Sequence, residues 1–277
     1  MINLDPYSEQ FLNGMARLNE RLDRAQKQLT SGRRVSAVSD EPDRVARLVE
    51  QRTDLGRIEQ IQRNLGAVKG DIDTAESALQ SGVSLLERAR TLATQGANGT
   101  QTPATRRSIG AEVASILENL VGIANTTFQG RYLFAGDRDT AAPYALDPSQ
   151  TNGVGAYAGT DATRSIEHPT GIRIVISRTA SEIFEDPAGQ NVFAAVNELQ
   201  RALSVNDEPA IEDAIGLVTA AHVQLSKALG TFGLLQNEIS GAADFAARQQ
   251  TLYKVELSNL ADADLAAATV DLNQARF

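Results

Sequence analysis

Three carboxylates within two helical turns come closest to a chemical site in this sequence. Asp71, Asp73 and Glu76 could offer oxygen ligands to a hard cation, and so could the pair Asp262 and Asp264. The first group, however, surrounds two apolar residues of a regular helical pattern. We therefore expect its carboxylates on a solvated helix face, without a bound metal.

Other chemistry finds little support. His168 precedes a proline in a loop, His222 lies in an alanine-rich stretch, and neither has a companion at the spacing of a metal site or a catalytic triad. With no cysteine in the chain, thiolate metal sites and cysteine nucleophiles are excluded. We expect no catalytic residue, no cofactor and no metal, and hence not an enzyme.

Two short motifs are interpreted as turn or loop features, and two glycosylation patterns are given no functional weight. Residues 137–139, Asp-Arg-Asp, lie in a turn-rich segment. The glycines of residues 153–159 resemble a phosphate-binding loop, but no apolar strand leads in and no Lys-Ser/Thr closes it, so a flexible loop is expected. Asn98-Gly99-Thr100 and Asn125-Thr126-Thr127 match the acceptor pattern for N-glycosylation, which is common by chance.

Composition favours long helices over a thick globular core, because the 277 residues include no tryptophan and only 5% aromatic residues. The net charge of -9 repels phosphate backbones, so no nucleic-acid partner is expected. No apolar run approaches the roughly 20 residues of a membrane span, so no membrane insertion is expected. The N-terminus has neither the basic nor the apolar part of a cleaved signal, so export would need another route.

The first predicted secondary-structure element is a helix over residues 7–29. Its apolar residues alternate in steps of four and three, the spacing of a coiled-coil seam. Gly32 is placed to end this helix, and residues 39–42, Ser-Asp-Glu-Pro, supply capping oxygens and a first-turn proline for the next one. The seam comprises Phe11, Met15, Leu18, Leu22, Ala25 and Leu29.

A second helix, from residue 43 to about 95, carries an unbroken seam and would be roughly 80 Å long. A glycine-rich loop at residues 96–103 reverses the chain, and a return helix then makes an antiparallel hairpin. Seam residues of the two helices are Ile61, Leu65, Val68, Ile72, Ala75, Leu79, Gly82, Leu86, Ala89 and Ala93, then Ile109, Val113, Ile116, Leu120 and Ile123.

From residue 129 to 190 the pattern changes, and residues 132–134 and 172–176 are predicted as strands. Helix returns at 192–203, breaks at 206–209 and continues almost to the end, with a last seam at Ile239, Ala243, Ala246, Gln250, Tyr253, Leu257 and Leu260. The predicted fold is mainly α, an elongated antiparallel helical hairpin and coiled-coil bundle with a small β-rich inserted domain. Its expected parts are 1–42, 43–130, 131–190, 191–240 and 241–277.

Four segments resemble the bacterial flagellin superfamily: LTSGRRV at 29–35 with SDEP at 39–42, LLERARTLATQGANGT at 85–100, and LADADL at 260–265. The resemblance covers about the first 135 and the last 85 residues. Within that superfamily, GRYLFAG at 130–136 is similar to the hook-filament junction proteins, hook-associated protein 3, more than to filament flagellins. Relatives of this type continue for a few more helical turns, so either the sequence stops before the natural end or this member is short.

The resemblance implies a secreted, extracellular structural subunit of the flagellum at the hook-filament junction. It would be exported unfolded by the flagellar type III apparatus and would polymerise through its terminal helices. Its partners would be copies of itself, another hook-associated protein, flagellin and an export chaperone. The expected assembly interface is Phe11, Met15, Leu18, Leu22, Leu29, Tyr253, Leu257, Leu260 and Leu265.

Three further hypotheses stay open. Arg88, Arg90 and Leu92 match the stretch of filament flagellins that innate immune receptors recognise, which implies a possible receptor-recognition patch. The chain could instead be a short filament flagellin. From another class, it could be a non-flagellar helical secreted scaffold, which predicts a stable monomer with ordered ends.

Overall fold

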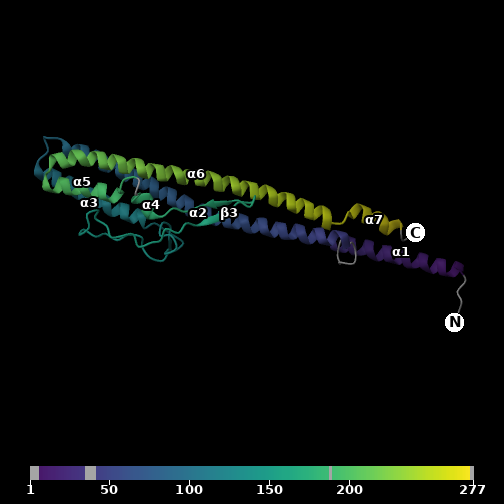
Figure 1. Ribbon diagram of the computed structural model, residues 1–277. Coiled ribbons are helices and arrows are strands. Elements are labelled where there is room, and N and C mark those ends of the chain that lie inside the picture. The colour runs from purple at the N-terminus through teal and green to yellow at the C-terminus, as the bar shows by residue number, and fades with distance from the viewer. Residues whose placement is uncertain (1–5, 35–41, 187–188, 275–277) are drawn as a thin grey trace. The chain divides into compact units, whose positions relative to one another are not determined.

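The computed structural model describes residues 6–34, 42–186 and 189–274 (Figure 1). In this part of the chain the elements are α1 (Pro6–Ser31), α2 (Pro42–Ala97), α3 (Pro103–Ala124), β1 (Thr127–Phe128), β2 (Arg131–Tyr132), β3 (Ser165–Glu167), β4 (Arg173–Val175), α4 (Ala180–Phe184), α5 (Val192–Val205), α6 (Glu208–Ala261) and α7 (Leu265–Gln274). The predicted class, mainly α with a small β-rich insertion, is confirmed.

The chain divides into two compact units. Unit 1 is formed by residues 1–62 and 245–277, and unit 2 by residues 63–244. Each unit is described by itself. The five-part division expected from the sequence stays a prediction.

In unit 1, α1 ends where the sequence predicted. Gly32 adopts a positive φ of 67°, and its N–H donates to Gln28 O at 2.8 Å. Glycine takes this left-handed conformation at low cost, which makes it a common helix terminator. The capping residues expected at 39–41 lie outside the described residues.

The C-terminal part of unit 1 corrects one prediction, because the last helix is interrupted. Helix α6 ends at Ala261, and α7 begins only at Leu265. Main-chain bonds at the interruption join the chain ends: Arg34 N–H donates to Ala261 O at 2.7 Å and Ala263 N–H donates to Gly32 O at 2.9 Å. Asp264 Oδ1 then caps α7 by accepting from the N–H groups of Ala266 and Ala267, both at 3.0 Å.

Unit 2 is built on the predicted hairpin of α2 and α3, with α5 and α6 packed against it (Figure 1). Thr102 caps α3 by accepting from Thr105 N–H at 3.2 Å, and Pro103 occupies the first turn. A Cβ added at Gly82 would lie 2.8 Å from Leu225 Cδ2, so α2 and α6 approach closely there. The seam residues of α2 and α3 in this unit are buried as predicted, except that Val68 and Ile123 are half-buried.

The insertion of unit 2 holds two antiparallel hairpins, β1 with β2 and β3 with β4. Of the strand predicted at residues 132–134, only Tyr132 is in a strand, whereas Leu133 and Phe134 are buried in turns. The strand predicted at 172–176 is confirmed over β4. Strands β1 and β3 and helix α4 were missed, because each is five residues or shorter.

An aromatic cluster anchors the insertion to the helices of unit 2. Phe193 of α5 lies 5.0 Å from Tyr144 and 5.1 Å from Phe184 between ring centroids. Tyr157, from the glycine run expected as a flexible loop, donates its hydroxyl to Phe134 O at 2.9 Å. This run is therefore packed against the insertion.

Candidate assembly surfaces

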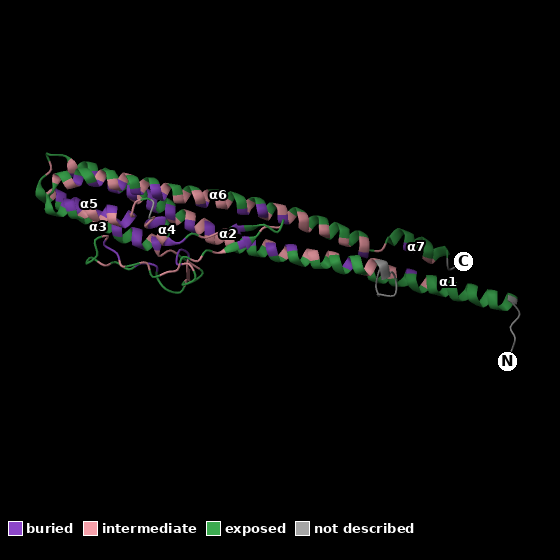
Figure 2. Ribbon diagram, viewed as in Figure 1, coloured by how far each residue is buried: buried purple, intermediate pink, exposed green. Residues whose placement is uncertain are grey.

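Helix α1 carries an exposed apolar stripe in unit 1. Phe11 is 68% exposed, Met15 44% and Leu18 37%, and they follow the predicted seam. Tyr7 and Leu12 are exposed beside them, and Figure 2 shows α1 as exposed along most of its length. This part of the stripe is therefore accessible to another chain.

The C-terminal half of the same helix is better covered. Ala25 is buried, Leu22 and Leu29 are half-buried, and α1 contacts α7, whose Ala268 is also buried. Small alanine side chains let two helices approach closely. The two ends of the chain therefore partly satisfy each other.

The residues of the predicted C-terminal interface differ in their exposure. Tyr253, Leu257 and Leu260 are half-buried within the unit, whereas Leu265 is exposed. Sequence reasoning missed the exposed apolar residues on other faces of α6 and α7, which include Leu252, Val255 and Val270. The step of three from Leu252 to Val255 is a helical signal, but it falls outside the main seam.

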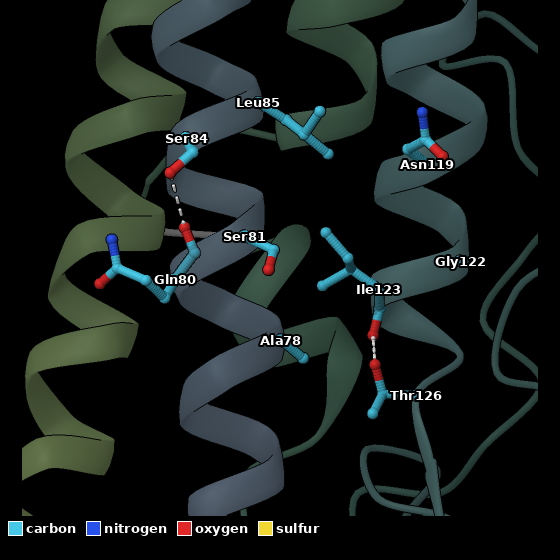
Figure 3. Close-up of a pocket in the computed structure, with 9 residues that line it drawn as sticks. All are labelled: Ala78, Gln80, Ser81, Ser84, Leu85, Asn119, Gly122, Ile123 and Thr126. Atoms are coloured by element: carbon cyan, nitrogen blue, oxygen red, sulfur yellow. Dashed lines mark hydrogen bonds between the residues drawn. The ribbon is translucent and has the colours of Figure 1, made fainter.

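A groove of about 760 Å³ runs between α2 and α3 in unit 2 (Figure 3). Small and polar side chains line most of it, and Leu85 and Ile123 are its large apolar members. The hydroxyls are satisfied locally: Ser84 donates to Gln80 O at 3.2 Å and Thr126 donates to Ile123 O at 2.7 Å. The full lining is Ala78, Gln80, Ser81, Ser84, Leu85, Asn119, Gly122, Ile123 and Thr126.

The predicted receptor patch is only partly on the surface. Arg88 is exposed and pairs with Glu112 of α3, its Nη2 lying 2.6 Å from Glu112 Oε1. Arg90 is exposed, but Leu92 is only 1% exposed. The two arginines are thus accessible and Leu92 belongs to the core.

The carboxylates of α2 have protein partners, which corrects the expected solvated face. Asp71 is mostly buried and lies 3.7 Å from Arg131 and 3.6 Å from Arg164, two residues of the insertion. Asp73 accepts from Gln236 Nε2 at 2.8 Å and from Lys69 at 2.9 Å. The hydrogen bond from Gln236, followed by that from Lys69, lowers the pKa of Asp73 below the ordinary value of 3.8.

The remaining candidate groups lie beside polar neighbours. His222 Nε2 lies 3.5 Å from Glu87 Oε1 but has no hydrogen-bond partner among the described residues, and His168 Nδ1 accepts from Thr170 N–H at 3.1 Å. Asp139 lies in a turn near Arg131, with 3.8 Å between Oδ2 and Nη1. Among the described residues, no three His, Cys, Asp or Glu side chains gather as a metal site.

Within the described ranges, no helix combines the length and apolar character needed to cross a bilayer.

Comparison with known proteins shows which proteins this chain is similar to. Residues 2–139 match the model of the bacterial flagellin N-terminal helical region. Flagellin B of Helicobacter pylori is 26% identical over 191 residues, which are 68% of this chain and 36% of that protein. Flagellar hook-associated protein 3 of Salmonella typhimurium is 22% identical over 279 residues, covering 92% of this chain and 86% of that protein.

The structural comparison agrees on the fold. A flagellar hook-associated protein of Vibrio parahaemolyticus has a TM-score of 0.71 and 19% identity, covering 80% of this chain and 100% of that one. These findings define the class as the structural proteins of bacterial flagella. The chain belongs to the bacterial flagellin family, as its sequence motifs indicated. It spans about a third of the Helicobacter flagellin that it matches, but most of the length of the Salmonella protein.

Proposed function

We propose that this chain is the structural subunit that joins the hook to the filament of a bacterial flagellum. The observation that carries the proposal is the extent of the matches. The hook-associated protein 3 relative is matched over 86% of its length, whereas the flagellin relative is matched over only 36%. The chain acts without catalysis, and its site of action is the extracellular hook-filament junction.

The exposed stripe of α1 supports assembly with copies of the chain and with neighbouring flagellar proteins. Phe11, Met15 and Leu18 are 68%, 44% and 37% exposed in the single chain. Full burial of a wholly exposed apolar side chain contributes about 1.5 to 3 kcal/mol, and burial of these three contributes in proportion to the surface they still expose. Exposed ion pairs contribute less than about 1 kcal/mol each, so apolar burial would dominate the assembly energy.

The test of assembly is a pair of substitutions in α1. Phe11→Asp is expected to abolish incorporation into flagella, because it places a charge in the apolar stripe. Arg24→Glu, at an exposed position outside the stripe, is expected to leave incorporation intact. Both variants should retain the fold of the single chain. Normal incorporation of Phe11→Asp would contradict this role of α1.

The location is tested by immunogold electron microscopy of intact flagella, with antibody raised against residues 129–190. A narrow band of label between hook and filament is expected. Label along the whole filament would instead favour a filament flagellin. No label on flagella would favour the non-flagellar scaffold.

Two partner proposals rest on the family resemblance. An export chaperone would cover the C-terminal seam, whose Tyr253, Leu257 and Leu260 are only half-buried. If a chain deleted after Gly241 still binds the chaperone in a pull-down, the proposed role of the C-terminal seam is contradicted. For a host receptor, Arg88 and Arg90 are the accessible contacts, and unaltered receptor binding after replacement of both would contradict that role.

A further inference from the structure

The turn between α2 and α3 contains an asparagine followed by glycine, a pair prone to deamidation. Asn98, Gly99 and Thr100 are all exposed. A glycine lacks the side chain that would hinder its nitrogen from approaching the preceding asparagine. The structure adds features that activate this asparagine and leave its reacting nitrogens available.

The side-chain carbonyl of Asn98 receives two hydrogen bonds from one residue. Thr100 N–H donates to Asn98 Oδ1 at 3.0 Å, and the Thr100 hydroxyl donates to the same oxygen at 2.9 Å. A turn closed by the side chain in this way is a common conformation of asparagine. The same two donors stabilise the negative charge that develops on Oδ1 when a nucleophile attacks Cγ.

The main chain at Asn98 is also held in place. Buried Arg106 donates from Nη2 to Asn98 O at 3.3 Å, and Gln101 N–H donates to the same oxygen at 3.0 Å. Among the described residues, none accepts a hydrogen bond from Gly99 N–H or from Asn98 Nδ2. The attacking nitrogen and the leaving nitrogen are thus both unengaged.

We propose that Asn98 is a site of spontaneous deamidation promoted by the folded turn. The Gly99 nitrogen bonds to Asn98 Cγ, the bond from Cγ to Nδ2 breaks, and Nδ2 leaves as ammonia with the proton given up by Gly99. Water then opens the resulting succinimide at either carbonyl, which yields aspartate or isoaspartate. The product places a new carboxylate in the turn that Arg106 holds.

The chain contains two other Asn-Gly pairs, and the structure protects both. At Asn152, Val154 N–H again donates to Oδ1, at 3.2 Å, but Nδ2 donates to Glu185 Oε1 at 3.3 Å. Gly153 is buried and its N–H donates to Gln150 O at 3.1 Å. Asn13 lies inside α1, where each main-chain N–H is engaged by the carbonyl four residues earlier.

These pairs provide internal controls for one experiment on the full chain. The folded protein is incubated in mildly alkaline buffer, and aspartate and isoaspartate at each asparagine are quantified over time by peptide mass spectrometry. Asn98 is expected to convert about tenfold faster than Asn152, with the difference lost in urea, and Asn13 reports how far the main-chain bonds of α1 protect an Asn-Gly pair. Conversion of Asn98 no faster than Asn152, or faster in urea than in the native protein, would overturn the proposal.

Two variants separate the effects of the Thr100 hydroxyl and of Gly99 on the rate of deamidation. Thr100→Val removes the hydroxyl donor but keeps the N–H, and it is expected to slow conversion severalfold. Gly99→Ala is expected to slow it further, since its Cβ hinders attack while meeting only Glu208 Oε1, at 3.4 Å. Circular dichroism controls for folding. An unchanged rate in Thr100→Val, or a glycan on Asn98 in protein from the source organism, would overturn the proposal.

Discussion

Helices α1 and α3 have the same apolar spacing but different surroundings. Of the described side chains of α1, only Ala25 is buried, although the helix is 26 residues long. Helix α3 has 22 residues and buries nine, from Arg106 to Ala124. A heptad pattern therefore predicts a helix and its apolar face, but it does not predict whether the partner of that face lies in the same chain.

The two helices also differ in what fixes their ends. Helix α3 begins at a Thr102 cap with Pro103 in its first turn. Its Arg106 donates to Gly96 O at 2.8 Å and to Asn206 Oδ1 at 2.9 Å, which ties α3 to the C-terminal ends of α2 and α5. Near α1, the main-chain bonds to the C-terminal part of the chain come from Gly32 and Arg34, which follow its C-terminal end. Most of α1 is thus left to its own helical propensity, which is marginal in water.

The largest expected difference concerns amide hydrogen exchange of the single chain. Amides of α3 at Val113 and Leu120 should exchange only through large-scale unfolding of unit 2. Those at Leu18 and Leu22 in α1 should exchange faster by about three orders of magnitude or more. Strong protection at Leu18 and Leu22 in a monomer would mean that α1 is held more firmly than its contact with α7 accounts for.

Truncation of one apolar residue in each helix gives the next largest effect. Leu120→Ala is expected to lower the free energy of unfolding by about 2 to 5 kcal/mol, because it leaves a cavity in a fully buried site. Phe11→Ala should change it by less than about 0.5 kcal/mol, since the ring is mostly exposed. Urea unfolding of the monomer measures both values. If both variants lost the same free energy of unfolding, the ring of Phe11 would be packed against other residues of the monomer in solution.

The same contrast shows how much of the fold could be predicted. Helix boundaries were predicted well because Gly32, Pro103 and the segment at 206–209 act locally, and Asn206 does adopt the left-handed conformation of a helix terminator, with φ of 59°. The interruption after Ala261 was missed because it depends on bonds to Gly32 and Arg34, which are remote in sequence. The short strands were missed for a similar reason, since their stability comes from packing.

The candidate surfaces were predicted less completely than the fold. Phe11, Met15 and Leu18 were identified because an apolar seam needs a partner. Leu92 was placed in a surface patch by resemblance, yet it lies in the core. The roles of Asp71 and Asp73 could not be predicted, because Arg131, Arg164 and Gln236 approach them from distant parts of the chain.

Replacing one arginine in each helix tests the same contrast between α3 and α1 with polar side chains. Arg106→Ala is expected to lower the free energy of unfolding by about 1 to 3 kcal/mol, because it leaves the buried Gly96 carbonyl without this donor. Arg21→Ala, at an exposed position of α1, should stay within about 0.5 kcal/mol of the parent chain. Thermal or urea unfolding compares the two. If Arg106→Ala leaves the free energy of unfolding unchanged, water has replaced the hydrogen bonds of the guanidinium.

The smallest expected effect is the pH dependence contributed by Asp73. Its pKa in the folded chain is lowered, so its contribution is fully present above the ordinary value of 3.8 and is lost as pH falls through the lowered pKa. The side chain is 42% exposed, so solvent screening keeps this contribution below about 1 kcal/mol. Asp73→Asn should make the free energy of unfolding depend less steeply on pH in the acid range. Acid unfolding curves that coincide for parent and Asp73→Asn would contradict this role.

The pair of main-chain bonds between Gly32–Arg34 and Ala261–Ala263 has a consequence for the order of folding. Closing so long a loop in a fully unfolded chain carries an entropic cost that rises with its length. Once unit 2 is folded, Asp73 and Gln236 are already in contact, and only two short stretches of chain remain to be ordered. Docking of the chain ends should therefore be the last kinetic phase and the first to reverse, which keeps the ends available until unit 2 is complete.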